Sequence, residues 1–183
     1  NCVDVITSNK AEIISISQFL KIDNMRIPEY QRPYKWTEKN VMQLINDIFI
    51  HKDKSRYRLG TIVIHQNYIK EEGKVYNDIV DGQQRFTTLR IILYALCKLA
   101  TENKNNYESY IVEQVQSLKH KVDTISIEYN NKESVKQIAS NYQAAFRSLS
   151  KFDTLTIKAF LEKCEVVVFY ITDLTEAFQF FDS

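Results

Sequence analysis

The chain has 183 residues, of which 44% are hydrophobic and 26% are charged, with a formal net charge of +1. These values are ordinary for a globular domain that buries a core. The charge balance does not indicate a nucleic-acid or membrane partner, although a local basic site remains possible. Because the chain has only three glycines and two prolines, long helices are favoured over a loop-rich all-β fold.

The three cysteines are odd in number and far apart in the sequence, at Cys2, Cys97 and Cys164. This spacing indicates neither a zinc site nor a disulfide framework, and it favours a reducing, cytoplasmic setting. No apolar stretch approaches the ~18 residues that would span a bilayer. No signal peptide is visible either. We therefore expect no membrane partner.

The first half of the chain predicts a strand hairpin framed by helices. One or two helical turns are expected at 13–20, and a short extended piece at 25–27 ends at Pro28. Thr37 is a good N-cap for a helix that ends near His51. The pattern then predicts a connector at 51–58, followed by two strands at 57–68 and 75–80 that are joined by a turn at 71–74. A long helix is predicted from Gly82 to about Ala100.

The second half predicts mostly helices, expected at 107–118, 132–149, 154–164 and 175–181. Alternation over 124–129 predicts a strand. The unbroken apolar run over 165–171 predicts a strand buried on both faces.

One face of the helix at 132–149 carries apolar residues, namely Val135, Ile138, Tyr142 and Phe146. The order of elements predicts a mixed α/β (α+β) domain. We place its core at 1–103 and a helical annex at 104–183, from which the strand at 165–171 returns to the core.

Asp81-Gly82-Gln83-Gln84-Arg85 forms a strand-to-helix turn suited to a phosphate. A helix N-terminus offers unpaired N–H groups and a partial positive charge. Gly82 lets a ligand approach the backbone, and Arg85 can hold a phosphate with two hydrogen bonds. Gln83 and Gln84 add hydrogen-bonding groups, as do the hydroxyls of Thr87 and Thr88. Asp81 could bind a metal ion through water or orient an attacking water.

A purely structural interpretation of the same turn is strong. Asp81 with Gln84 three residues later fits a capping box in which Asp replaces Ser or Thr. Capping alone would explain these two residues, but it leaves Gly82, Gln83 and Arg85 unexplained. A cap can also coexist with a ligand site, so both interpretations stay open.

The segment 28–36 is a stiff, proline-bracketed loop rich in aromatic and basic side chains. Tyr30, Tyr34 and Trp36 could stack on a base, and Arg32 could contact a phosphate. Alternatively, Tyr34 and Trp36 anchor the loop against the helix that follows. The basic run at 52–58 is better explained as a solvated connector than as a nucleic-acid contact.

Together, the two motifs resemble a known family. The residues IPEYQRPYKW at 27–36, a strand opened by Leu59-Gly60, and IVDGQQRFTTL at 79–89 are similar to the N-terminal domain of GmrSD-type restriction proteins. The similarity covers roughly residues 12–183. Phe86 stands where the family usually has Leu, which is a conservative change. The family is in turn similar to the ParB/sulfiredoxin fold, whose members bind nucleotide phosphates on an equivalent turn.

The resemblance implies a module that binds, and often hydrolyses, a nucleoside triphosphate with Mg²⁺ in defence against modified phage DNA. The implied partners are a C-terminal nuclease domain or a separate nuclease, and modified DNA through the full-length protein. No nuclease motif is visible in these residues. The residues that the motifs assign to nucleotide binding are Gln31, Arg32, Tyr34, Gly60, Gly82, Gln83, Arg85, Thr87 and Thr88. Those assigned to catalysis are Asp81, Gln84 and Arg85, with Asp81 as the candidate Mg²⁺ ligand.

Two other functions remain open at this point. A DNA-binding or nuclease module using the same basic loop would show steeply salt-dependent DNA binding. A non-catalytic interaction domain would use the motif only as a cap and packing turn, and no nucleotide would stabilise it.

Overall fold

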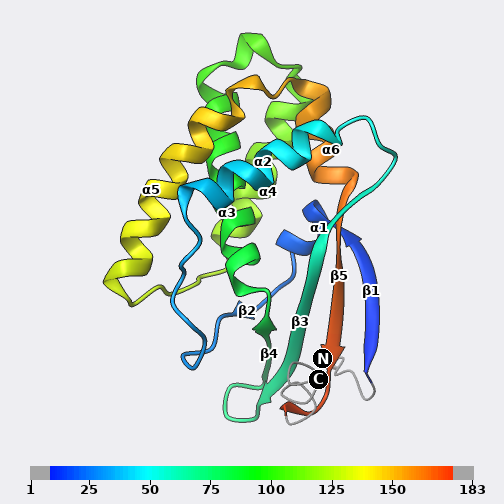
Figure 1. Cartoon of the computed structure of the whole chain (residues 1–183). Helices are drawn as coiled ribbons and strands as arrows, with labels where there is room; N and C mark the ends of the chain where they lie inside the picture. The colour runs from blue at the N-terminus through cyan, green and yellow to red at the C-terminus, as the bar shows by residue number, and fades with distance from the viewer. Residues whose placement is uncertain (1–8, 175–183) are drawn as a thin grey trace.

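The computed structural model describes residues 9–174 as a five-stranded mixed sheet with helices grouped beyond one end of its strands (Figure 1). The strand order is β1-β5-β3-β4-β2. Strand β5 runs antiparallel to β1 and parallel to β3, while β4 runs antiparallel to β3 and parallel to β2. The strands are β1 (Lys10–Ser15), β2 (Met25–Arg26), β3 (Tyr57–Ile69), β4 (Lys74–Asp81) and β5 (Cys164–Ile171).

Six α-helices lie within the described residues, and the expected mixed α/β class is therefore confirmed. They are α1 (Ile16–Leu20), α2 (Glu38–Ile50), α3 (Gln83–Glu102), α4 (Ser109–Asp123), α5 (Lys132–Ser148) and α6 (Thr154–Glu162). Two short 3₁₀ turns, Lys104–Asn106 and Leu149–Lys151, follow α3 and α5. None of the described helices combines the length and apolar character needed to cross a bilayer.

A single large hydrophobic cluster joins the sheet to the helices. It includes Ile62 of β3, Val166 of β5, Leu89 of α3 and Val115 of α4, each with no exposed surface. Residues from both 1–103 and 104–183 thus share this core. The division of the chain at 103/104 stays a prediction.

Several predicted elements are confirmed, with a clear local cause. Thr37 caps α2 through a capping box with Asn40. The β3–β4 hairpin and the long α3 lie where the sequence placed them. The short extended piece before Pro28 is β2, which pairs with β4 at the edge of the sheet.

The strand predicted at 124–129 is wrong. Its side chains do alternate, since Ile125 is buried while Ser126 and Glu128 are exposed. However, none of the described strands pairs with this segment, which is irregular. The alternation arises because the segment packs one side against the helical body, and such packing needs no hydrogen-bonded neighbour.

Three smaller expectations also differ from the structure. Residues 13–15 belong to β1, and Ser15 caps the short helix that follows. Val135 is 55% exposed, because the buried positions of α5 include Ser134, Asn141 and Ala145 instead. In β5 one face is buried and the other only half-buried, so the expectation of burial on both faces is wrong. The helix expected at 175–181 lies outside the described residues.

Candidate functional site

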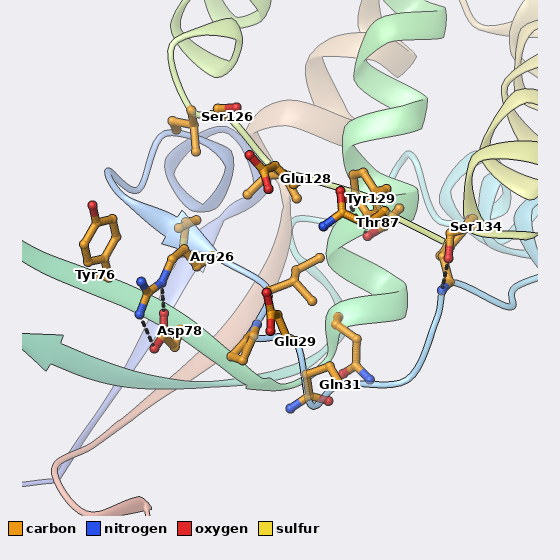
Figure 2. Close-up of a pocket in the computed structure, with 18 of the residues that line it drawn as sticks. Arg26, Glu29, Gln31, Tyr76, Asp78, Thr87, Ser126, Glu128, Tyr129 and Ser134 are labelled. Carbon is orange, nitrogen blue, oxygen red and sulfur yellow. Dashed lines mark hydrogen bonds and ion pairs between the residues drawn. The ribbon is translucent and has the colours of Figure 1, made fainter. Parts of the chain in front are cut away.

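A cavity of about 1110 Å³ lies at the junction of sheet and helices (Figure 2). Its walls come from β2 and the loop as far as Tyr34, from β3 and β4, from the first turn of α3, and from residues 124–131. The cavity is large enough for a nucleotide-sized molecule. Of the residues predicted from the motifs, those on its wall are Gln31, Arg32, Tyr34, Gln83, Gln84 and Thr87.

The first turn of α3 has no side-chain cap. Its N-cap is Gly82, which has a left-handed φ of 96° and supplies no side-chain hydrogen bond, and the first turn contains no acidic residue. L side chains rarely adopt this φ, and a Cβ at position 82 would also lie 2.5 Å from Cδ1 of Ile62 and 3.2 Å from the carbonyl oxygen of Thr61, so the position favours glycine. The capping box predicted for Asp81 and Gln84 is wrong, because Asp81 ends β4 one residue before the N-cap.

Gln84 holds the proline-bracketed loop in place. Its Oε1 accepts hydrogen bonds from the backbone N–H groups of Lys35 at 2.7 Å and Trp36 at 3.2 Å. Its Nε2 donates to the carbonyl of Pro33 at 3.0 Å. Since all three contacts are to backbone, Gln84 acts here as a clamp between α3 and the loop.

Tyr34 extends this clamp into the core. Its hydroxyl lies 2.8 Å from Oγ1 of Thr88 and accepts from Nδ2 of Asn141 at 2.9 Å. Asn141, which has no exposed surface, also donates to the carbonyl of Trp36 at 2.7 Å. Burial raises the pKa of the Tyr34 phenol, which keeps it neutral in this network. Tyr34 and Thr88 thus have structural partners, although Tyr34 also reaches the cavity wall.

Arg85 turns away from the cavity and lies across β3. It donates to the carbonyl of Leu59, which sits at a register shift between β3 and β5. Its guanidinium occupies the space where a side chain at Gly60 would be, since a Cβ there would overlap Nη1. Burial lowers the pKa of Arg85, and its Nε has no hydrogen-bond acceptor among the described residues. The predicted residues that do not line the cavity are Gly60, Asp81, Gly82, Arg85 and Thr88.

Sequence reasoning missed an ion pair in the cavity wall. Arg26 donates to the Asp78 carboxylate from Nε at 2.7 Å and from Nη2 at 2.9 Å. The central carbon of the Arg26 guanidinium also lies over the ring of Tyr76, 4.1 Å from its centroid. The two charged residues are 52 positions apart and meet only because β2 pairs with β4. No short-range sequence signal could have linked them.

Several charged side chains of the wall have no ion-pair partner within the part of the chain that the structure describes. Arg32 and Lys74 are cations of this kind, and Glu29 and Glu128 are carboxylates. Among the described residues, no group of three or more His, Cys, Asp or Glu is arranged to hold a metal ion. Mg²⁺ is usually held by one or two carboxylates together with phosphates. Glu29 and Glu128 fit that role better than Asp81, which does not line the cavity.

Fold and cavity together define a mixed α/β domain with a polar pocket at a strand-to-helix turn. The family model described as the GmrSD restriction endonuclease, N-terminal domain, matches residues 15–183, and the chain belongs to this family. It is therefore a module of a restriction and defence protein. Comparison with curated proteins gave no match.

Proposed function

We propose that the cavity binds a nucleoside triphosphate and that the chain is the nucleotide-binding module of a restriction protein. The triphosphate would lie against the first turn of α3, and Mg²⁺ would accompany it. Hydrolysis is what the family resemblance implies. The contacts support binding more directly than hydrolysis. Of the residues assigned to catalysis, Asp81 and Arg85 lie off the cavity wall, and Gln84 holds the loop in place.

The observation that carries this proposal is the uncapped N-terminus of α3 on the cavity wall. A helix start leaves its first N–H groups without intrahelical partners and carries roughly half a unit of positive charge. Here neither a capping side chain nor an acidic first-turn residue offsets that charge. Gln83 and Gln84 of this turn line the cavity, as does the cation Arg32. This arrangement favours an extended polyanion.

Mg²⁺ would neutralise part of the charge of the bound phosphates. The cavity wall contains three cations and four carboxylates, so it does not by itself offset a triphosphate. Arg26 pairs with Asp78, and Asp23 pairs with Lys121, which leaves Glu29 and Glu128 to contact the ion. Glu29 and Glu128 would therefore contact the Mg²⁺ ion that the phosphates carry.

A thermal-shift panel of the common nucleoside triphosphates with millimolar magnesium tests the proposal. At a ligand concentration of 100 Kd, binding adds ~2.7 kcal/mol to stability. For a domain of this size that corresponds to a rise in Tm of about 5–10 °C. Arg32→Ala should reduce the shift, because it removes an exposed cation from the wall. Arg56→Ala, an exposed cation off the cavity wall, is the matched control.

The alternatives predict different outcomes of the same panel. If no triphosphate raises Tm and none binds at millimolar concentration, the proposal fails and an interaction domain is favoured. Salt-dependent DNA binding that Arg32→Ala weakens would instead favour the DNA-binding module. If a triphosphate does bind, two partners that the family implies would respond to the bound nucleotide. They are a nuclease domain or separate nuclease, and modified DNA.

A further inference from the structure

We propose that the β2–β4 end of the cavity is a stacking subsite for the base of the nucleotide, with the Arg26 guanidinium as its platform. This inference rests on the proposed function and adds the orientation of the ligand. The phosphates would lie at the α3 end of the cavity, and the base would lie at the opposite wall, beside Tyr76 and Asp78 (Figure 2).

The Arg26 guanidinium is held in a fixed plane. Two parallel hydrogen bonds join it to Asp78, whose residue surface is only 5% exposed. Such a bidentate pair restricts the guanidinium geometrically as well as holding it. Asn67 donates to the same carboxylate at 3.3 Å and so helps to fix Asp78 in turn. The platform is therefore arranged before any ligand arrives.

Tyr76 lies beside the guanidinium, on the side away from Glu29 and Glu128 (Figure 2). The ring centroid of Tyr76 lies 4.1 Å from the central carbon of the guanidinium. The Arg26 side chain is nevertheless 38% exposed and lines the cavity. Figure 2 shows Arg26 between Tyr76 and the space bordered by Glu29 and Glu128. Since planar bases stack on arginine guanidinium groups, the side toward this space fits a nucleobase.

The ion pair also has a structural role, which does not account for this arrangement. It joins the two-residue strand β2 to β4 at the edge of the sheet, where only two pairs of residues are in register. Joining the strands requires only that the charges meet. It does not require an aromatic ring behind the guanidinium or a cavity in front of it. A subsite for a planar group uses all three features.

The test compares nucleotide with inorganic tripolyphosphate, both with magnesium, by isothermal titration calorimetry. Arg26→Lys keeps a charge beside Asp78 but removes the plane, and Tyr76→Leu removes the ring that supports it. Each variant should bind nucleoside triphosphate about 10-fold more weakly, as expected for the loss of one stacking contact. Affinity for tripolyphosphate should stay within about twofold of wild type, because the α3 end is unchanged.

Arg58→Lys is the matched control. Arg58 pairs with Glu165 at 3.4 Å between β3 and β5, away from the cavity wall, and its substitution should change neither affinity. If both variants bind nucleotide as wild type does, or lose affinity for both ligands equally, the subsite is refuted while the proposed function stands. If wild type itself binds no nucleotide, both fail. Tyr76→Leu decides the question should Arg26→Lys not fold.

Discussion

Gly60 and Arg85 both belong to the motifs, and the structure shows that they contact each other. The guanidinium of Arg85 crosses β3 where Gly60 leaves room for it. The register shift beside Gly60 places the carbonyl of Leu59 where Arg85 can donate to it. The pair therefore joins the start of α3 to the sheet. Motif residues can thus be required for the shape of a site without facing its ligand.

We expect Gly60→Ala to destabilise the fold through this contact. The φ of 144° and the overlap with Nη1 should together cost about 2–3 kcal/mol. In an Arg85→Ala background the added cost should be smaller, because the overlapping atoms are gone. Urea unfolding of the two single variants and the double variant measures this coupling.

Gly73→Ala is the control for backbone strain alone. Gly73 has a φ of +62°, and a Cβ at this position would have nothing within 4 Å, so its substitution should cost about 1 kcal/mol. Equal costs of Gly60→Ala with and without Arg85 would show that the overlap with Arg85 adds nothing to the cost of this substitution.

Cys164 should make stability depend on pH in the alkaline range. Burial raises the pKa of its thiol to about 12, whereas an unfolded cysteine titrates near 8.5. A raised folded pKa contributes stability that is complete below about pH 8.5 and is lost as pH rises toward the folded value. Between about pH 8.5 and 10, wild type should lose ~1–2 kcal/mol more than Cys164→Ala. Parallel pH profiles from urea unfolding would contradict this.

At the scale of elements, the sequence predicts segments whose signals are local. Thr37 and Asn40 cap α2 from within four residues, and the β3–β4 hairpin follows from strand composition and a turn at Gly73. The segment 124–131 shows why this logic fails elsewhere. A two-residue alternation reports which side chains are buried, but it cannot report whether a partner strand is present.

Asn141 links α5 to the loop at 28–36. We expect Asn141→Ala to lower the stability of the fold and to loosen the attachment of this loop. Removing Nδ2 leaves the half-buried carbonyl of Trp36 without this donor, which should cost about 1–2 kcal/mol. The chain has a single tryptophan, so Trp36 emission reports directly on the loop. We expect a shift to longer wavelength in the folded variant.

Gln143→Ala, at an exposed position of the same helix, is the control for helix propensity. It should leave both the emission and the unfolding midpoint close to wild type. An Asn141→Ala variant with unchanged Trp36 emission and full stability would show that the loop does not depend on α5.

At the scale of the whole molecule, the site combines segments that are distant in sequence. The sequence located the loop at 28–36 and the turn at 81–88, because each is a compact run of unusual residues. It did not locate Arg26 with Asp78, or the wall at 124–131, because their proximity depends on how β2, β4 and the helices assemble. The direction of the Arg85 side chain could not be predicted for the same reason, because it depends on the register shift in β3 that positions the carbonyl of Leu59.

The same long-range assembly predicts that residues 1–103 do not fold alone. Among the described strands, β1 pairs only with β5, and β3 would expose an unpaired apolar edge without β5. The buried face of α3 would also lose α4 and α5, against which it packs. We expect the 1–103 fragment to show no cooperative thermal transition by circular dichroism, whereas coexpression with 104–183 should restore one. A cooperative transition for 1–103 alone, with Trp36 emission like that of the full chain, would instead support two separate folding units.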